Sequence, residues 1–239
     1  MVRCRGVGIR RGGSAGCNNE ASSRCDRDRC RACCSGCSYH EPLFKPTCGS
    51  KKRKRALDRT DIIEKLRLHE SDFDERYDFV YTADGSQTRR RGGEQFVWPA
   101  GWSKLALNVS AHNKIDRDGH EWLDRDEGWP VAFHGTSGGD RDVIRDIIRN
   151  GFKVRGGEST ARNGELFGSG IYCTPDPSFA AIYAADDPWH TDSGHVLEVV
   201  FQVRVRPGRY AEYSHKKGRC WVVERSQDIR PCGILFRET

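Results

Sequence analysis

The chain has little of what would place it in or across a membrane. Its 239 residues include no apolar run near the roughly 18–20 residues that a membrane-spanning helix needs. The opening residues, Met-Val-Arg-Cys-Arg-Gly, lack the apolar stretch of a secretory signal peptide. We therefore expect an intracellular protein with no membrane partner. Apolar residues make up only 36% of the chain, so part of it is expected to remain unfolded.

Cysteine is nearly absent from the chain beyond residue 48. Eight of the 11 cysteines lie at or before Cys48, and only Cys173, Cys220 and Cys232 follow. A disulfide framework would be spread through a secreted domain, so this distribution also favours a reducing compartment. We expect Cys173 and Cys232 to pack in the interior.

Positive charge is concentrated at the N-terminal end. Residues 1–60 carry 15 Lys or Arg against 5 Asp or Glu, a net charge of +10, whereas the remainder carries 25 against 29, a net charge of −4. The run Lys51–Arg55 holds five consecutive cations. Such runs occur in nuclear localisation signals and in nucleic-acid contacts, but a solvated charge run is an equal alternative. Nuclear localisation and non-specific nucleic-acid contact through residues 1–58 are the resulting expectations.

The N-terminal cysteines leave two interpretations open. Cys30 and Cys33 form one Cys-x-x-Cys pair, and Cys34 and Cys37 form a second directly after it. Paired thiolates of this kind can hold zinc, although zinc sites usually separate the two pairs by a dozen or more residues. Residues 1–58 are therefore predicted to be a basic, Cys-rich tail that is disordered unless a metal organises it.

The rest of the chain divides into a segment over 59–128 and a core over 129–239. The spacing of apolar residues predicts a short helix over 59–70, and the alternation of Tyr77, Phe79 and Tyr81 predicts a strand. Trp122 and Trp129 fall in a polar stretch that is expected to be a loop.

Within the core, capping residues and apolar periodicity predict several elements. A strand over 131–134, a helix over 140–150 closed by Gly151, and a helix that starts at Asp176-Pro177 follow one another. Further strands are expected over 194–205, 221–223 and 234–236. Strands mixed with a few helices indicate an α+β domain.

One stretch indicates a ligand. Residues 168–184, Gly-Ser-Gly-Ile-Tyr-Cys-Thr-Pro-Asp-Pro-Ser-Phe-Ala-Ala-Ile-Tyr-Ala, carry Tyr172 and Tyr183 a short way after His134-Gly135-Thr136. Two aromatic faces, a histidine and glycine backbone without a Cβ suit a nucleotide with a planar ring, such as NAD. The glycines do not match the Gly-x-Gly-x-x-Gly fingerprint of a Rossmann fold.

In this order and spacing, the segments resemble the catalytic domain of poly(ADP-ribose) polymerase-like ADP-ribosyltransferases. The resemblance rests on "VAFHGT", "VIRDIIRNGF", "LFGSGIYCTPDPSFAAIYA" and "CWVVERSQDIRPCGILF" and covers roughly Trp129 to Phe236. It implies an ADP-ribosyltransferase-like split β-sheet whose cleft holds NAD as substrate.

The resemblance also implies roles for individual residues. His134 would bond the adenosine ribose, and the backbone of Gly135, followed by Thr136, would hold the nicotinamide carboxamide. Tyr172 and Tyr183 would sandwich the nicotinamide ring. The serine that the family places three residues before the second tyrosine is Ala180 here, which leaves Ser178 as a substitute.

The third position of the family's His-Tyr-Glu triad departs from the pattern. Aligning "WVVERSQDI" puts Cys220 where the glutamate belongs. A carboxylate there would stabilise the oxocarbenium character of the ribose and help to activate the acceptor, and a neutral thiol does both poorly. Glu224, on the same side of a strand but roughly 13 Å further along, is one possible substitute, and Glu212 is another.

The expected activity is therefore transfer of ADP-ribose from NAD to a protein acceptor with release of nicotinamide, as single units rather than chains. The alternative is a catalytically disabled module that binds NAD or ADP-ribose.

Overall fold

The computed structural model describes residues 58–83, 89–110, 121–154, 167–216 and 218–239. A six-stranded sheet forms its centre, in the order β1-β4-β11-β8-β5, with β7 also paired to β8. All strand pairings described in this sheet are antiparallel. The strands are β1 (Phe79–Val80), β4 (Ser103–Ala106), β5 (Val131–Gly135), β7 (Trp189–His190), β8 (Val196–Val205) and β11 (Ile229–Glu238).

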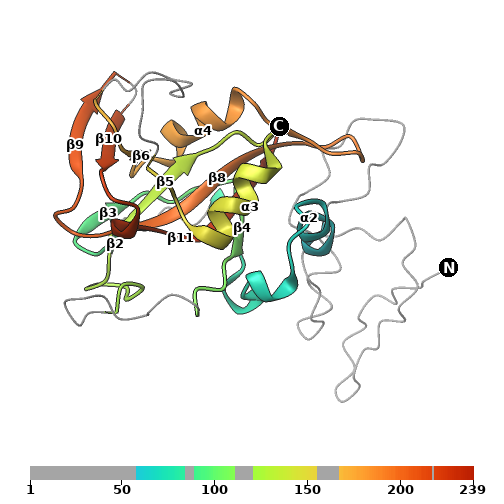
Figure 1. Cartoon of the computed structure of the whole chain (residues 1–239), viewed down its shortest axis with the longest axis horizontal. Coiled ribbons are helices and arrows are strands. Elements are labelled where there is room, and N and C mark those ends of the chain that lie inside the picture. Colours follow the sequence, from blue (N-terminus) through green and yellow to red (C-terminus); the bar gives the residue numbers. More distant parts are fainter. Residues whose placement is uncertain (1–57, 84–88, 111–120, 155–166, 217) are drawn as a thin grey trace, which may run out of the picture. The chain divides into compact units, whose positions relative to one another are not determined.

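Two smaller sheets accompany it. One has the order β6-β10-β9 and the other joins β2 to β3. The strands are β2 (Arg89–Arg91), β3 (Glu94–Phe96), β6 (Ile171–Cys173), β9 (Ala211–His215) and β10 (Gly218–Val223). With three α-helices among the described residues, the domain is α+β with a divided sheet, as the sequence predicts (Figure 1).

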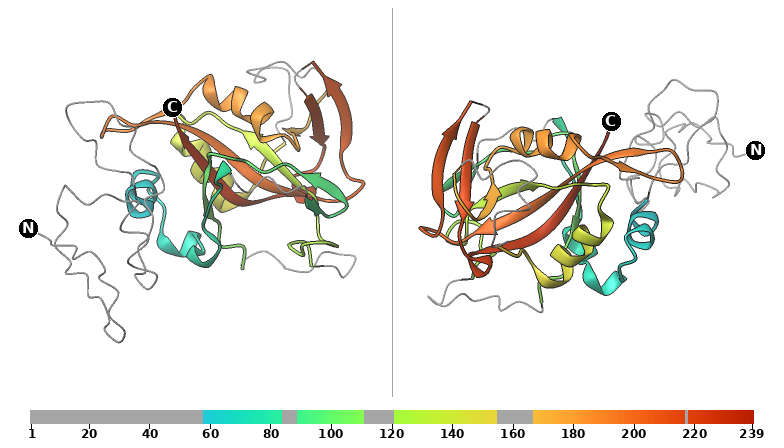
Figure 2. Two further views of the ribbon diagram at one scale, coloured as in Figure 1. Left: turned by 180° about the vertical axis from the view of Figure 1, so that it is seen from behind. Right: turned by 45° about the horizontal axis from the view of Figure 1, so that its top comes forward.

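Helices cover both faces of the central sheet. On β8, Val199, Phe201 and Val203 belong to one apolar cluster with helix α3, whereas Val200 belongs to another with helix α4. Alternate residues of a strand point to opposite faces, so α3 and α4 lie on opposite sides of β8, as the views in Figure 2 show. Because both faces are covered, β8 is buried along nearly its whole length.

Helices α3 (Arg141–Asn150) and α4 (Pro177–Ala185) confirm the predictions from capping residues. The Asp140 side chain accepts a hydrogen bond from the Val143 N–H, and the Asp176 side chain accepts one from the Ser178 N–H. Each bond satisfies an N–H that has no partner within its own helix. Gly151, at φ 76°, ends α3 in a conformation that favours glycine.

Helix α2 (Arg59–Lys65) is shorter than the predicted helix over 59–70. Its apolar residues Ile62, Ile63 and Leu66 are buried in the same cluster as β8. The helix stops because Arg67 adopts a left-handed conformation with φ 52°. The Arg67 N–H then bonds the Glu64 carbonyl and the Leu68 N–H bonds the Ile63 carbonyl, which is the hydrogen-bond pattern of a Schellman cap. The 3₁₀-helix η1 (Glu70–Asp72) follows it.

The strand predicted from Tyr77, Phe79 and Tyr81 is largely wrong. Tyr77 ends the 3₁₀-helix η2 (Glu75–Tyr77), and only Phe79 and Val80 pair as β1. The alternation instead reflects a ring cluster in which Phe79, Tyr81 and Trp98 meet edge to face at 4.8–5.6 Å. The alternate spacing of these aromatic residues therefore reflects ring packing at the edge of the sheet and not a long strand.

Trp122 and Trp129 lie in a loop, as expected, but both are fully buried. The guanidinium of the buried Arg204 holds this loop by donating to the carbonyls of Leu123 and Trp129. Arg230 stacks over both indole rings, with its guanidinium carbon 5.1 Å and 4.6 Å from their centroids. The loop packs by cation–π and charge-assisted contacts, which a hydropathy pattern does not reveal.

The predicted tail, with its disorder, its possible zinc and the run Lys51–Arg55, lies outside the described residues. Within the described ranges, no group of three or more His, Cys, Asp or Glu side chains is placed to hold a metal ion. None of the helices described there has the length and apolar character of a membrane span.

The cap of α2 generates a stability prediction. We expect Arg67→Gly to raise the free energy of unfolding by about 0.5–1 kcal/mol, because glycine adopts φ 52° without a Cβ penalty. The matched control, Glu64→Gly, places a glycine at an exposed helical position of the same element and should lower it by about 1 kcal/mol. Urea denaturation measures both, and equal signs for the two variants would contradict the assignment.

Candidate functional site: the meeting of β5, β6, β10 and helix α4

The central sheet and the three-stranded sheet meet at the end of β5. The Phe133 N–H donates to the Thr174 carbonyl at 2.7 Å, and the Thr174 N–H donates back to the Phe133 carbonyl at 2.9 Å. This pair of bonds brings the end of β6 against β5 immediately before His134 and Gly135. Two sequence segments about 40 residues apart thereby form one wall.

His134 is oriented by that junction. Its Nδ1 lies 2.7 Å from the carbonyl oxygen of Tyr172, and a carbonyl only accepts, so Nδ1 carries the proton. In the neutral ring Nε2 is then an acceptor. Burial lowers the pKa of His134, and the Tyr172 carbonyl offsets part of this effect. The ring is therefore held neutral, with one acceptor nitrogen suited to a ligand hydroxyl.

Gly135 lies in direct contact with helix α4. A Cβ at this position would come within 2.1 Å of the Ala180 carbonyl oxygen and 2.9 Å of Tyr183 Cβ. No side chain fits there without moving the helix, so glycine is required for the approach of α4 to β5. The contact sets Tyr183 beside the Gly135 backbone. Thr136, the next residue, is buried, and its N–H bonds the Val199 carbonyl.

Tyr172 and Tyr183 differ in how firmly they are held. The Tyr172 hydroxyl donates to the Gly168 carbonyl at 2.6 Å and accepts from the Phe167 N–H at 3.0 Å. Tyr183 projects from α4 and is 38% exposed. Burial is the main cause that raises the pKa of Tyr183, and the neighbouring Cys220, Asp186 and Tyr172 add to it. The structure thus brings both tyrosines and Cys220 to one place.

Cys220 lies on β10 in an apolar environment. It is buried with Phe179 and Val222, and partly buried residues complete the cluster, namely Phe167, Tyr172, Ile182 and Tyr213. Burial raises the pKa of the Cys220 thiol to about 11. At neutral pH this thiol is uncharged, and it neither stabilises a cation nor acts as a general base.

Glu212 does not reach this cluster. It lies opposite Trp221 on the paired strand, whereas Cys220 lies opposite Tyr213. Directly opposed residues share a face and consecutive residues alternate, so Glu212 is on the other side of the sheet from Cys220. There its carboxylate accepts from the Trp221 Nε1 at 2.7 Å and from Arg219 at 3.1 Å.

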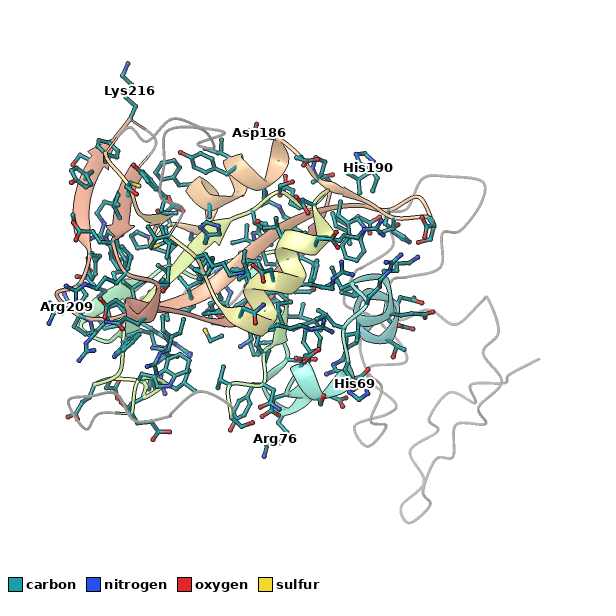
Figure 3. The ribbon with its side chains drawn as sticks, in the orientation of Figure 1. His69, Arg76, Asp186, His190, Arg209 and Lys216 are labelled. Carbon is teal, nitrogen blue, oxygen red and sulfur yellow. The ribbon has the colours of Figure 1, made fainter. Side chains whose placement is uncertain are left out.

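Glu224 and Ser178 are both exposed. β10 ends at Val223, so Glu224 stands just beyond the strand that carries Cys220. Ser178 is the second residue of α4, and its N–H bonds the Asp176 side chain. Asp186, the C-cap residue at the other end of α4, and Lys216, the residue after β9, are labelled in Figure 3. Ala180 is completely buried and contributes its carbonyl, not its side chain, to the contact with Gly135.

Three contributors were not singled out as site residues from the sequence. Phe152 meets the His134 ring edge to face at 4.9 Å, and Tyr213 stacks on Phe167 with the rings 9° from parallel. Phe179, a third, was visible only as an apolar position of a predicted helix. These contacts cross between elements, so local spacing does not predict them.

The comparison with known families decides what kind of domain this is. Residues 109–212 match the model of the poly(ADP-ribose) polymerase catalytic domain. These 104 of the 239 residues are similar to the catalytic domain of ADP-ribosyltransferases of the poly(ADP-ribose) polymerase type. A search of curated proteins finds no match.

The match covers only part of the candidate site. It includes the four residues that we call the clamp, His134, Gly135, Tyr172 and Tyr183, and it stops before Cys220. ADP-ribosyltransferase domains of this family use NAD as the donor of ADP-ribose, and the α+β fold with its divided sheet agrees with that family. For Cys220, at the third position of the triad, the comparison gives no information, and only its surroundings on β10 indicate its chemistry.

The environment of Cys220 generates a chemical prediction. In the native protein, the rate of Cys220 alkylation by iodoacetamide should keep rising about tenfold per pH unit between about pH 8 and 9.5, because the thiol ionises near pH 11. Mass spectrometry of the tryptic peptide Cys220–Arg225 measures this rate. The unfolded protein is the control, with a rate that levels near pH 8.5. If the alkylation rate of the native protein also levelled near pH 8.5, the pKa of the Cys220 thiol would not be raised and the prediction would be wrong.

Proposed function

We propose that the protein transfers a single ADP-ribose from NAD to a protein side chain and releases nicotinamide. The observation that carries the proposal is the convergence of the clamp: His134 bonds the Tyr172 carbonyl, and Tyr183 lies against the Gly135 backbone. Two tyrosines, a neutral histidine acceptor and a bare glycine backbone are the groups that a nicotinamide riboside would use.

In this proposal each residue of the clamp has one task. Tyr172 and Tyr183 hold the nicotinamide ring, and aromatic contacts of this kind are worth on the order of 1 kcal/mol beyond the area buried. The Gly135 backbone holds the carboxamide, and His134 Nε2 accepts from a ribose hydroxyl. The bond between the ribose C1′ and the nicotinamide nitrogen breaks, and its electron pair leaves with nicotinamide. The acceptor then bonds C1′ and gives up its proton to solvent.

The neutral Cys220 supports single transfer over chain growth. Elongation needs a ribose hydroxyl as acceptor, and a hydroxyl must lose its proton to attack. A thiol with a pKa of about 11, enclosed by Phe179 and Val222, is not a base for that proton. An acceptor side chain that is already ionised or strongly nucleophilic does not need such a base.

The neutral Cys220 also supports a second candidate function, a module that binds NAD or ADP-ribose without turning it over. Among the described residues, Cys220 and its cluster supply no carboxylate to the clamp, and Glu212 faces away. The two candidates share the clamp and differ only in whether the bond to nicotinamide is broken.

The test compares wild type with Cys220→Glu and with Cys220→Gln as the control of matched shape. Wild type should bind NAD by calorimetry and attach biotinylated ADP-ribose to protein as single units. Cys220→Glu should consume NAD about 100-fold faster, since a placed general base or electrostatic group is typically worth that much or more. Because Phe179 encloses the position, the gain should grow as pH rises through the raised pKa of the new carboxylate.

The outcomes separate the candidates. NAD binding without labelling by wild type, together with labelling by Cys220→Glu, establishes the disabled module. Chains of ADP-ribose on the wild-type product would contradict single transfer. No NAD binding, with Tyr172→Ala indistinguishable from wild type, would remove both candidates.

The N-terminal segment is proposed to contact nucleic acid without sequence specificity and to direct the protein to the nucleus. The support is its net charge of +10 over residues 1–60 and the run Lys51–Arg55. A protein acceptor remains the partner proposed for the catalytic domain.

Replacing all five residues of Lys51–Arg55 by glutamine in the full chain should weaken binding to a DNA duplex and flatten its dependence on salt. For every phosphate that the protein no longer neutralises, the log–log slope of affinity against salt falls by about one unit. Replacing three exposed arginines of the described part, Arg141, Arg209 and Arg225, is the matched control. Filter binding at about 50 mM and 200 mM salt measures the slope. Equal weakening in both variants would contradict a contact confined to the tail.

A further inference from the structure

Phe152 is the last residue of the segment "VIRDIIRNGF", to which the family resemblance assigns no role, yet its ring contacts that of His134. The two ring centroids are 4.9 Å apart at 70°, an edge-to-face arrangement. Phe152 is itself held from behind by Phe201, at 5.9 Å and 78°. It is 5% exposed and belongs to the main core cluster. His134 therefore lies between a backbone carbonyl on one side and a fixed aromatic ring on another.

The end of helix α3 determines this placement. Gly151 closes the helix at φ 76°, and the following residue, Phe152, turns into the core. A hydrophobic residue just after a glycine cap often packs back on the structure that it leaves. Here it packs on the histidine of β5, so the cap of α3 connects directly to the site.

We propose that Phe152 is a positioning residue, which holds His134 in the neutral tautomer whose Nε2 accepts a hydroxyl of the bound nucleotide. The proposal rests on the proposed function only in naming NAD as that nucleotide. The Tyr172 carbonyl requires a proton on Nδ1, and the apolar Phe152 ring lies against the imidazole, where it disfavours the charge that a second proton would bring. Protonation would turn Nε2 from an acceptor into a donor and remove its bond to the ligand.

No described charge near the ring competes with this arrangement. The titratable groups on the elements around it are Tyr172 and Cys173 of β6 and Tyr183 of α4, and burial raises the pKa of both Cys173 and Tyr183. Tyr172 is engaged with Gly168 and Phe167.

The charged side chains on the neighbouring elements α3 and β8 are paired with other residues or lie on the opposite face of the sheet from His134. On α3 and just after it, Arg145 pairs with Asp142 and Lys153 pairs with Asp146. On β8, Phe201 lies opposite His134 and on the same face of the sheet. Glu198 and Arg204 are each three residues away from Phe201, so their side chains lie on the other face, where Glu198 bonds Arg237. The protonation of His134 is therefore governed by burial and by the Tyr172 carbonyl, which agrees with the lowered pKa of the ring.

The test replaces Phe152 by leucine, which keeps an apolar side chain and removes the ring. Phe236→Leu is the matched control, because Phe236 is a fully buried aromatic of the same cluster that packs on Trp189. Two readouts are used. Long-range ¹H–¹⁵N correlation spectra report the tautomer and titration of His134 in the free protein. Calorimetry reports NAD affinity between about pH 8 and 5.5, a range that spans the ordinary pKa of histidine.

In wild type and Phe236→Leu, we expect His134 to titrate below the ordinary pKa of histidine, and NAD affinity to change less than about twofold between pH 8 and that ordinary value. In Phe152→Leu, the ring should titrate closer to pH 6.5, with affinity near that of wild type at pH 8 and about tenfold weaker one unit below the new pKa.

Unchanged titration of His134 in Phe152→Leu would overturn the proposal, as would the same pH-dependent loss in Phe236→Leu. If wild type does not bind NAD, the proposed function fails, and the titration alone still decides the role of Phe152. Should Phe152→Leu unfold, Phe152→Met provides the same test with an unbranched, flexible side chain that fills irregular space.

Discussion

The site depends on the backbone junction that joins the two sheets. Two hydrogen bonds between Phe133 and Thr174 attach β6 to the edge strand β5, and the bond from His134 to the Tyr172 carbonyl continues that line by one residue. The junction thereby holds Tyr172 of the three-stranded sheet beside His134 of the central sheet. Because β10 pairs with β6, the position of Cys220 is also set by it.

A second constraint acts from the other side, where α4 presses its backbone against Gly135. The Ala180 carbonyl occupies the space of a Cβ, so the helix can approach only a glycine. Tyr183 is consequently placed by the position of the helix and by its ring contact with Phe179, and it stays more exposed than Tyr172. A site with one anchored ring and one accessible ring can admit a flat ligand from the helix side.

The position that the family resemblance assigns to a glutamate is occupied by Cys220, in surroundings that are mostly apolar. Cys220 occupies an apolar cluster with Phe179 and Val222, and the neighbouring glutamate Glu212 is engaged with Trp221 on the opposite face. The surroundings are thus matched to a neutral residue. A carboxylate introduced there would be partly desolvated, which raises its pKa and makes its effect depend on pH.

The sequence alone determined the features that depend on near neighbours along the chain: the caps at Asp140 and Asp176, the strand β8, and the order of His134, Tyr172 and Tyr183 that identifies the family. Its errors, the length of α2 and the strand at Tyr77, arose where a left-handed Arg67 and an aromatic cluster overrode periodicity. Only the tertiary structure decided the tautomer of His134, the contact of Phe152 with it, the face on which Glu212 lies and the apolar surroundings of Cys220. Those properties depend on burial and on strand register. Both are set by groups that are distant in the sequence, so the local spacing of residues does not reveal them.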